Sequence, residues 1–182
     1  MKRALILILL AGCAGNPGPS DAGAPLDAGA DAGPDAGSFI ALAGDFDGFR
    51  AWQEFTVADP NNAIWDRFVW ISALPDHGAT EFPVGTRIVR QFADPTSATG
   101  YTLHAMAKRG GGFNAQDGGA HGWEWFELTD NDGGDVSIVW RGQDQPDGGP
   151  TYNGSNQTCT QCHVAAAAND YVQTPALKLS GF

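Results

Sequence analysis

The chain has 182 residues, of which 21 are acidic and 10 are basic, so its formal net charge at pH 7 is −11. This length suffices for one domain with a hydrophobic core. An acidic surface without a basic patch repels nucleic acid, which excludes DNA and RNA as expected partners.

The first 12 residues predict an export signal. A short basic head precedes an unbroken apolar run, Ala4–Leu10, which is too short to span a bilayer. The sequence Leu-Ala-Gly-Cys that ends at Cys13 resembles the lipobox of bacterial lipoproteins, in which the cysteine is lipidated and becomes the mature N-terminus. We expect a lipid anchor on Cys13 and, because Ala14 rather than Asp follows, a location at the outer membrane, facing the periplasm or the cell surface. An ordinary signal peptide cleaved near Ala14 is the alternative.

Residues 13–38 form a low-complexity segment in which Asp-Ala-Gly recurs at 21, 27, 31 and 35. Such a segment buries little apolar area, so we expect a flexible acidic tether; a recognition tag is the alternative. The domain itself is then 39–182. Without Lys2 and Arg3 the mature chain has 8 basic and 21 acidic residues, a net charge of −13, which suits a basic protein partner or a small neutral ligand.

Within residues 39–182 the apolar pattern predicts a helix followed by strands. Phe46, Phe49 and Trp52 recur at helical spacing. Short strand-like runs separated by Gly, Pro, Asp and Asn lie at 68–74, 85–92, 100–108, 122–128 and 136–142. Strands and helices do not alternate in the βαβ manner. The expected fold class is therefore α+β, mostly β, with an antiparallel sheet, an N-terminal helix and a C-terminal helical segment.

One motif near the C-terminus points to a specific chemistry. Cys159, Cys162 and His163 have the C-x-x-C-H spacing of c-type haem attachment. Two thiols add across the two vinyl groups of one porphyrin, so they must lie about one helical turn apart, and the histidine that follows supplies an axial nitrogen to the iron. The motif predicts one covalently attached haem c with His163 as the metal ligand. Haem c is assembled outside the bacterial cytoplasm, which agrees with the export signal.

Two other interpretations of the motif remain open. Cys159 and Cys162 form a disulfide in the first, as is common in exported proteins, although a thioredoxin-like site would need a βαβ context. In the second, they bind zinc with His163 and one more residue. A structural zinc site usually brings a second cysteine or histidine pair at short spacing, and the sequence has none.

The sixth position of the iron is either open or filled from upstream. None of the 19 residues after His163 is Met or His. The upstream candidates are Met106, His77, His104 and His121, and each of them also has an ordinary structural interpretation. The sequence favours none of them, so an open position is at least as well supported.

Residues 46–176 resemble the cytochrome P-460 family, which includes cytochrome c′-beta. The matching segments are FRAW, FPVGTRIVRQF, HAMAKR, HGWEWFEL and CTQCHVAAAANDYVQT. The most specific part is the haem motif followed by Asn-Asp-aromatic-Val at 169–172, whereas Gln173 stands where the family usually has Phe. The resemblance implies a mostly antiparallel β fold, a single haem c, proximal ligation by His163, an exported location and often a homodimer.

Known activities in this family are hydroxylamine oxidation in the P-460 branch and nitric oxide binding in the c′-beta branch. The resemblance therefore implies a five-coordinate haem that binds or redox-converts small nitrogen species, with a redox protein as partner. Whether the protein is an enzyme stays undecided. The alternatives are a six-coordinate electron carrier, and a non-haem surface lipoprotein that has a Cys159–Cys162 disulfide and binds through its Trp-rich sheet.

Two further residues are expected at the cofactor. In the P-460 branch a lysine is bonded to the porphyrin edge, and Arg90 falls at the matching position, where a protonated guanidinium is a poor nucleophile. We expect Arg90 to face the haem propionates or the pocket, Lys108 to be a surface residue, and the haem to be uncrosslinked. The carboxylate of Asp170 is expected either to orient the His163 imidazole N–H or to belong to a turn.

Overall fold

The computed structural model describes residues 38–57, 67–116, 118–131, 134–144 and 158–182. The expected signal peptide, the expected lipidation site Cys13 and nearly all of the expected tether lie outside these residues. Within the described ranges, no helix is both long enough and apolar enough to cross a bilayer.

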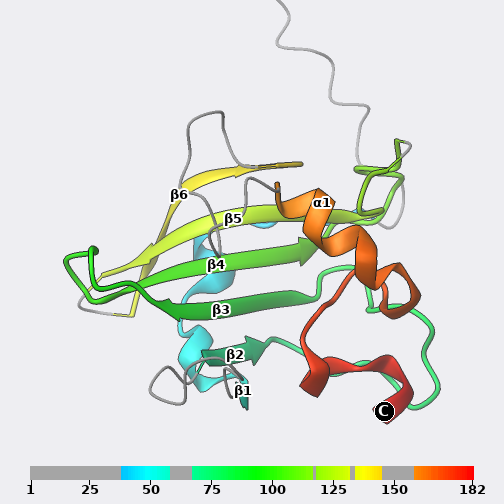
Figure 1. The fold of residues 1–182 in the computed structure, drawn as a ribbon, viewed down its shortest axis with the longest axis horizontal. Helices are drawn as coiled ribbons and strands as arrows, with labels where there is room; N and C mark the ends of the chain where they lie inside the picture. The colour runs from blue at the N-terminus through cyan, green and yellow to red at the C-terminus, as the bar shows by residue number, and fades with distance from the viewer. Residues whose placement is uncertain (1–37, 58–66, 117, 132–133, 145–157) are drawn as a thin grey trace, which may run out of the picture. The chain divides into compact units, whose positions relative to one another are not determined.

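The centre of the domain is an antiparallel sheet in which six strands pair in the order of the sequence (Figure 1). This arrangement confirms the α+β, mostly β class, and the five predicted strands are present with small shifts at their ends. A first strand, QEFTV, was not predicted. The strands are β1 (Gln53–Val57), β2 (Arg67–Ile71), β3 (Arg87–Ala93), β4 (Tyr101–Lys108), β5 (Trp123–Asp130) and β6 (Val136–Gly142).

The predicted N-terminal helix consists of two short 3-10 turns, η1 (Ala43–Phe46) and η2 (Phe49–Ala51). Gly48 separates them with a left-handed backbone, φ 64°, which glycine adopts without steric cost. Phe46 and Phe49 are buried as the helical spacing predicted. The spacing identified the buried side chains correctly, but it did not distinguish a continuous helix from two turns.

The two turns cover one face of the sheet, which we call the closed face. Side chains at alternate strand positions point to this face and pack against Phe46 and Phe49. The rings of Phe46 and Phe126 lie 5.1 Å apart, and those of Phe49 and Trp70 lie 5.1 Å apart. The buried residues of this core are Ala41, Phe46, Phe49, Trp70, Val89, Leu103, Ala105, Ala107, Phe126, Leu128 and Val136.

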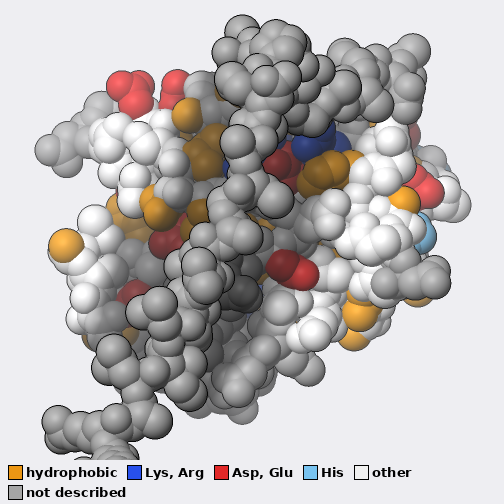
Figure 2. All heavy atoms as spheres, turned by 90° about the horizontal axis from the view of Figure 1, so that it is seen from above, with side chains coloured by type: hydrophobic (Ala, Val, Ile, Leu, Met, Phe, Trp, Pro, Cys, Tyr) orange, Lys and Arg blue, Asp and Glu red, His pale blue; other side chains and the backbone are white. Residues whose placement is uncertain are grey.

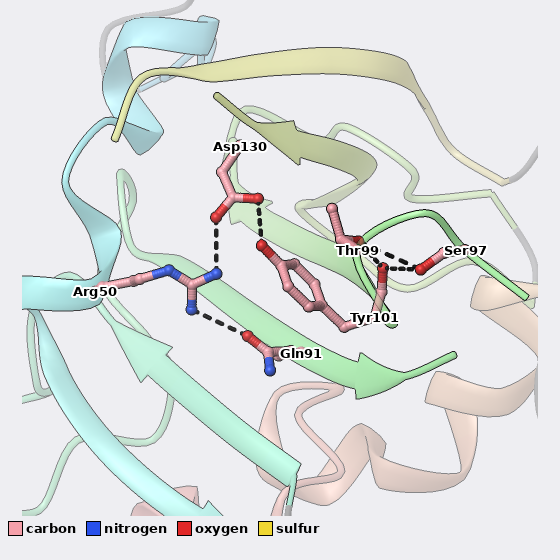
Figure 3. A network of polar contacts seen from close by, with 6 residues as sticks. All are labelled: Arg50, Gln91, Ser97, Thr99, Tyr101 and Asp130. Carbon is pink, nitrogen blue, oxygen red and sulfur yellow. Dashed lines mark hydrogen bonds and ion pairs between the residues drawn. The ribbon is translucent and has the colours of Figure 1, made fainter. Parts of the chain in front are cut away.

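A polar clamp joins η2 to the sheet beside this core (Figure 3). The Arg50 guanidinium donates to Asp130 over 2.7 Å and to Gln91 over 3.0 Å, and the Tyr101 hydroxyl donates to the other oxygen of Asp130 over 2.8 Å. The guanidinium also lies 4.8 Å from the centre of the Phe49 ring. The clamp fixes the turn to strands β3, β4 and β5.

The C-terminal segment covers part of the opposite face, which we call the pocket face. It contains α1 (Cys159–His163) and three 3-10 turns, η4 (Val164–Asn169), η5 (Pro175–Leu177) and η6 (Leu179–Gly181). In Figure 1 this orange and red segment lies in front of the sheet and the cyan turns lie behind it. The buried residues of this second core are Val69, Ile71, Phe82, Ile88, Met106, Ala120, Trp123, Trp125, Val172, Leu177 and Leu179.

Candidate functional site

The predicted motif forms the short helix α1, which begins with a side-chain cap. The Thr158 hydroxyl accepts a hydrogen bond from the Gln161 amide over 3.3 Å, and the Gln161 side chain accepts one from the Thr158 amide over 3.2 Å. This reciprocal capping starts the helix directly before Cys159. Because residues three apart in a helix lie on one side, the cap places the Cys159 and Cys162 thiols next to each other.

Thr160, between the two cysteines, anchors α1 to the sheet. Its side chain is buried, and its hydroxyl donates to the carbonyl of Gln143 over 2.9 Å. The same hydroxyl accepts from the Trp125 indole over 3.3 Å and from Asn114 over 3.4 Å, and the Thr160 amide donates to Asp144 over 2.8 Å. Sequence reasoning missed this anchor, since nothing in the motif distinguishes Thr160 from any other intervening residue.

Both thiols and His163 line one pocket between α1 and strands β3 to β6. The space between its side chains is about 870 Å³, part of it open to solvent. Its described lining residues are Ile88, Arg90, Phe92, His104, Ala105, Met106, Trp125, Phe126, Trp140, Thr158, Cys159, Cys162, His163, Val172, Gln173 and Thr174. None of these is Asp or Glu, whereas Figure 2 shows acidic side chains at several separate places on the outer face that it draws.

The His163 ring is held in one orientation. Its Nδ1 lies 2.6 Å from the carbonyl oxygen of Tyr171, and its ring centre lies 4.4 Å from that of Trp125. Burial lowers the pKa of His163 to about 4, with a further lowering from the Arg90 charge, although the Tyr171 hydrogen bond opposes the shift. The ring is therefore neutral at pH 7. A carbonyl can only accept, so Nδ1 carries the proton and Nε2 is left with the lone pair that a metal needs.

The direct contact expected between the Asp170 carboxylate and the His163 imidazole has to be corrected. Its carboxylate accepts from Lys108 Nζ over 2.5 Å and from the Phe82 amide over 2.9 Å. The group that contacts the His163 imidazole is the carbonyl of the next residue, Tyr171. The other expectation, that Asp170 belongs to a turn, is confirmed, because both Asp170 and Tyr171 have positive φ.

Lys108 is also placed differently from the expectation. It was expected on the surface, but only 5% of its area is exposed, and its ammonium pairs with Asp170. The cause is the alternation of β4, which points Lys108 to the pocket face together with Met106, where the C-terminal segment covers it. The Lys108 side chain is not among the described residues that line the pocket.

Two of the four candidate sixth ligands line the pocket, namely His104 and Met106. Burial and the nearby Arg90 charge lower the pKa of His104 to about 4, so this ring is neutral at pH 7. His77 and His121 are not among the described lining residues, and the His121 ring lies 5.7 Å from that of Tyr171.

Arg90 lines the pocket as expected, with its guanidinium carbon 4.0 Å from the centre of the Phe92 ring. Gln173, where the family pattern has Phe, also lines the pocket and donates through its side chain to the carbonyl of Cys162. A polar residue at 173 therefore has a definite structural role here, since it ties the chain after the turn to the end of α1.

The donor set fits a haem c. Cys159 and Cys162 offer two thiols on one wall, His163 offers one neutral imidazole nitrogen, and the opposite wall is largely aromatic and apolar. In the described residues no three His, Cys, Asp or Glu side chains converge as ligands of a bare metal ion. A haem iron requires only one nitrogen from the protein at this position.

No protein-family model, curated protein or solved structure matches the chain. The functional argument therefore depends on the residues of the site.

Proposed function

We propose that this protein is an exported mono-haem c-type cytochrome of the cytochrome P-460 and c′-beta kind. In this proposal Cys159 and Cys162 carry the thioether bonds and His163 is the axial ligand. The observation that carries the proposal is the pocket in which both thiols and the His163 ring lie together, with His163 Nδ1 hydrogen-bonded to a carbonyl. That hydrogen bond supports metal ligation, because it fixes the tautomer whose Nε2 is a ligand.

The lining of the pocket supports a role with small neutral molecules. When bound, a haem supplies an iron that changes oxidation state and takes a small ligand at its remaining position. Ile88, Met106 and Trp125 give the pocket apolar walls, which favour apolar diatomic molecules such as nitric oxide. Arg90 adds a fixed positive charge to a pocket without described carboxylates, which suits the two carboxylates of a haem.

Binding or redox conversion of nitric oxide is better supported than efficient hydroxylamine oxidation. The crosslinking lysine of the P-460 branch corresponds to Arg90, and the Lys108 amine is engaged with Asp170. We therefore propose an uncrosslinked haem. Mass spectrometry of tryptic haem peptides tests this point, and a peptide that joins the 159–163 segment to Lys108 through the haem would contradict it.

A six-coordinate electron carrier is the second candidate, since His104 and Met106 line the same pocket. Carbon monoxide separates the two functions: the reduced protein binds it rapidly if the sixth position is open, and slowly or not at all if a side chain fills it. His104→Leu and Met106→Leu then identify the side chain that fills the sixth position, because carbon monoxide binding would become faster only when that side chain is replaced.

The experiment that tests haem attachment is expression of the full chain with a cytochrome c maturation system. We expect a haem absorption spectrum and colour that resists extraction by acidified acetone. His163→Ala should keep the covalent colour but change the spin state. A chain without haem after maturation would favour the non-haem lipoprotein instead.

The location and partners belong to the same proposal. We propose a lipid anchor on Cys13 at the outer membrane, a redox protein as electron partner and a homodimer. Labelling with a radioactive fatty acid tests the anchor, with Cys13→Ala as its control, and sedimentation of the soluble domain tests the dimer.

A further inference from the structure

The turn after η4 has an unusual backbone. Asp170 has φ 47° and ψ 45°, and Tyr171 has φ 63°, so two successive non-glycine residues lie in the left-handed region. Residues other than glycine rarely adopt this region, because their Cβ atom clashes with the backbone. Tyrosine also has no side-chain oxygen close enough to its own backbone to form a compensating hydrogen bond. Contacts elsewhere in the fold must hold the turn in this conformation.

The Asp170 side chain supplies the strongest of these contacts. Its two oxygens accept from Lys108 Nζ over 2.5 Å and from the Phe82 amide over 2.9 Å. Asp170 and Lys108 are each only 5% exposed, so the pair is shielded from water and salt. A second carboxylate, Glu81, lies 3.8 Å from the same ammonium but is exposed.

The Lys108 side chain is itself fixed along its length. Its ammonium lies 5.3 Å from the centre of the Trp123 ring and 3.4 Å from the carbonyl of His121. A Cβ on Gly122 would come within 3.1 Å of the Lys108 chain, and Gly122 has φ 79°. The backbone of residues 121–123 therefore leaves room for the Lys108 side chain, which extends past it to reach Asp170.

We propose that Lys108 is a positioning residue for the iron ligand His163, acting through its ion pair with Asp170 and the turn that Asp170 shares with Tyr171. The carbonyl of Tyr171 ends this chain of contacts, 2.6 Å from His163 Nδ1. This inference rests on the proposed haem function in one respect, namely that His163 Nε2 binds iron.

The consequence concerns the strength of the ligand. A hydrogen bond from Nδ1 to a carbonyl raises the basicity of a ligating imidazole, and a more basic ligand favours ferric over ferrous iron. A loosened turn would move the Tyr171 carbonyl and weaken this hydrogen bond. The haem would then have a higher midpoint potential and a weaker iron–histidine bond.

The variants have to avoid an unpaired buried charge, since Lys108→Met alone leaves the Asp170 carboxylate without its partner and can prevent folding. The main variant is therefore the double substitution Lys108→Met with Asp170→Asn. Asparagine tolerates positive φ and still accepts from the Phe82 amide, so the ion pair is removed while this contact is kept. Lys178→Met is the matched control, because Lys178 is exposed in the same C-terminal segment.

The readouts are the iron–histidine stretching band of the reduced full chain, measured by resonance Raman, and the midpoint potential. We expect a lowered and broadened band and a raised potential in the double variant, and neither change in Lys178→Met. A folded double variant with the wild-type band and potential would overturn the proposal.

A separate measurement keeps this test distinct from the haem proposal. If the wild-type chain takes up no haem, the proposed function fails, and the ¹⁵N chemical shifts of the His163 ring in the haem-free full chain still decide the positioning role. We expect the Nδ1–H form in the wild type and a mixture of two tautomers in the double variant. Identical His163 shifts in both proteins would overturn it.

Discussion

The two faces of the sheet are covered in different ways. On the closed face, Phe46 and Phe49 fill an apolar core, and the polar clamp around Arg50 lies beside it. On the pocket face, the C-terminal segment covers one part with a buried ion pair and a left-handed turn, and it leaves a pocket over the other part. Among the described residues the closed face also holds a buried charge, Glu124, which pairs with Arg141 over 2.7 Å. The two successive left-handed residues and the pocket are on the pocket face, and because disfavoured backbone costs stability, they indicate where the chain is organised for a function.

The largest expected effect comes from the closed face. Phe46→Ala removes a fully buried ring that packs on Phe126, and we expect a loss of about 3–5 kcal/mol in the free energy of unfolding. Denaturant titration measures this loss. The haem spectrum of the protein that remains folded should match the wild type, and an altered spectrum would show that the two faces are coupled.

A medium effect is expected where α1 meets the sheet. Thr160→Val leaves the carbonyl of Gln143 and the indole of Trp125 without this partner, and we expect a loss of about 1–3 kcal/mol. Because α1 carries the thiols, the yield of haem-loaded protein should fall as well. Thr158→Val, at the half-buried cap of the same helix, is the control and should cost less. Equal yields from wild type and Thr160→Val would contradict the anchoring role.

The smallest effect is expected at the clamp, and it depends on pH. Burial alone would raise the pKa of Asp130, but the hydrogen bonds from Arg50 and Tyr101 lower it overall. A carboxyl whose pKa is lower in the folded state stabilises the protein above its unfolded pKa, and this contribution is lost as the pH falls through the folded value. Arg50→Met should therefore cost about 1 kcal/mol near pH 7 and progressively less in acid. Thermal unfolding followed from pH 7 to pH 3 measures the difference, and a cost that is constant with pH would contradict the clamp.

Much of the fold could be predicted from the sequence because its strands alternate and are punctuated by turn residues. The strand β4 was predicted at 100–108 and found at Tyr101–Lys108. The strand β1 was missed although Phe55 and Val57 alternate with Glu54 and Thr56, because this alternation covers only four residues and directly follows the predicted helix. The helix predicted from Phe46, Phe49 and Trp52 is interrupted by the left-handed Gly48.

The site could be predicted only as far as local spacing determines it. The proximity of Cys159, Cys162 and His163 follows from one helical turn, and in the structure all three residues lie in one short helix and line one pocket. The burial of Lys108 and the partner of Asp170 depend on how the C-terminal segment lies over β4, 62 residues away in the chain. A lysine is most often exposed, so composition and pattern favoured the wrong environment.

The measurement that tests the central claim most directly is acid–acetone extraction of the matured full chain beside the Cys159→Ser, Cys162→Ser double variant. The account predicts that all haem stays with the wild-type polypeptide and none stays with the variant, because these two thiols are the proposed points of attachment. Complete extraction of haem from the wild type, or equal retention by both proteins, would contradict it.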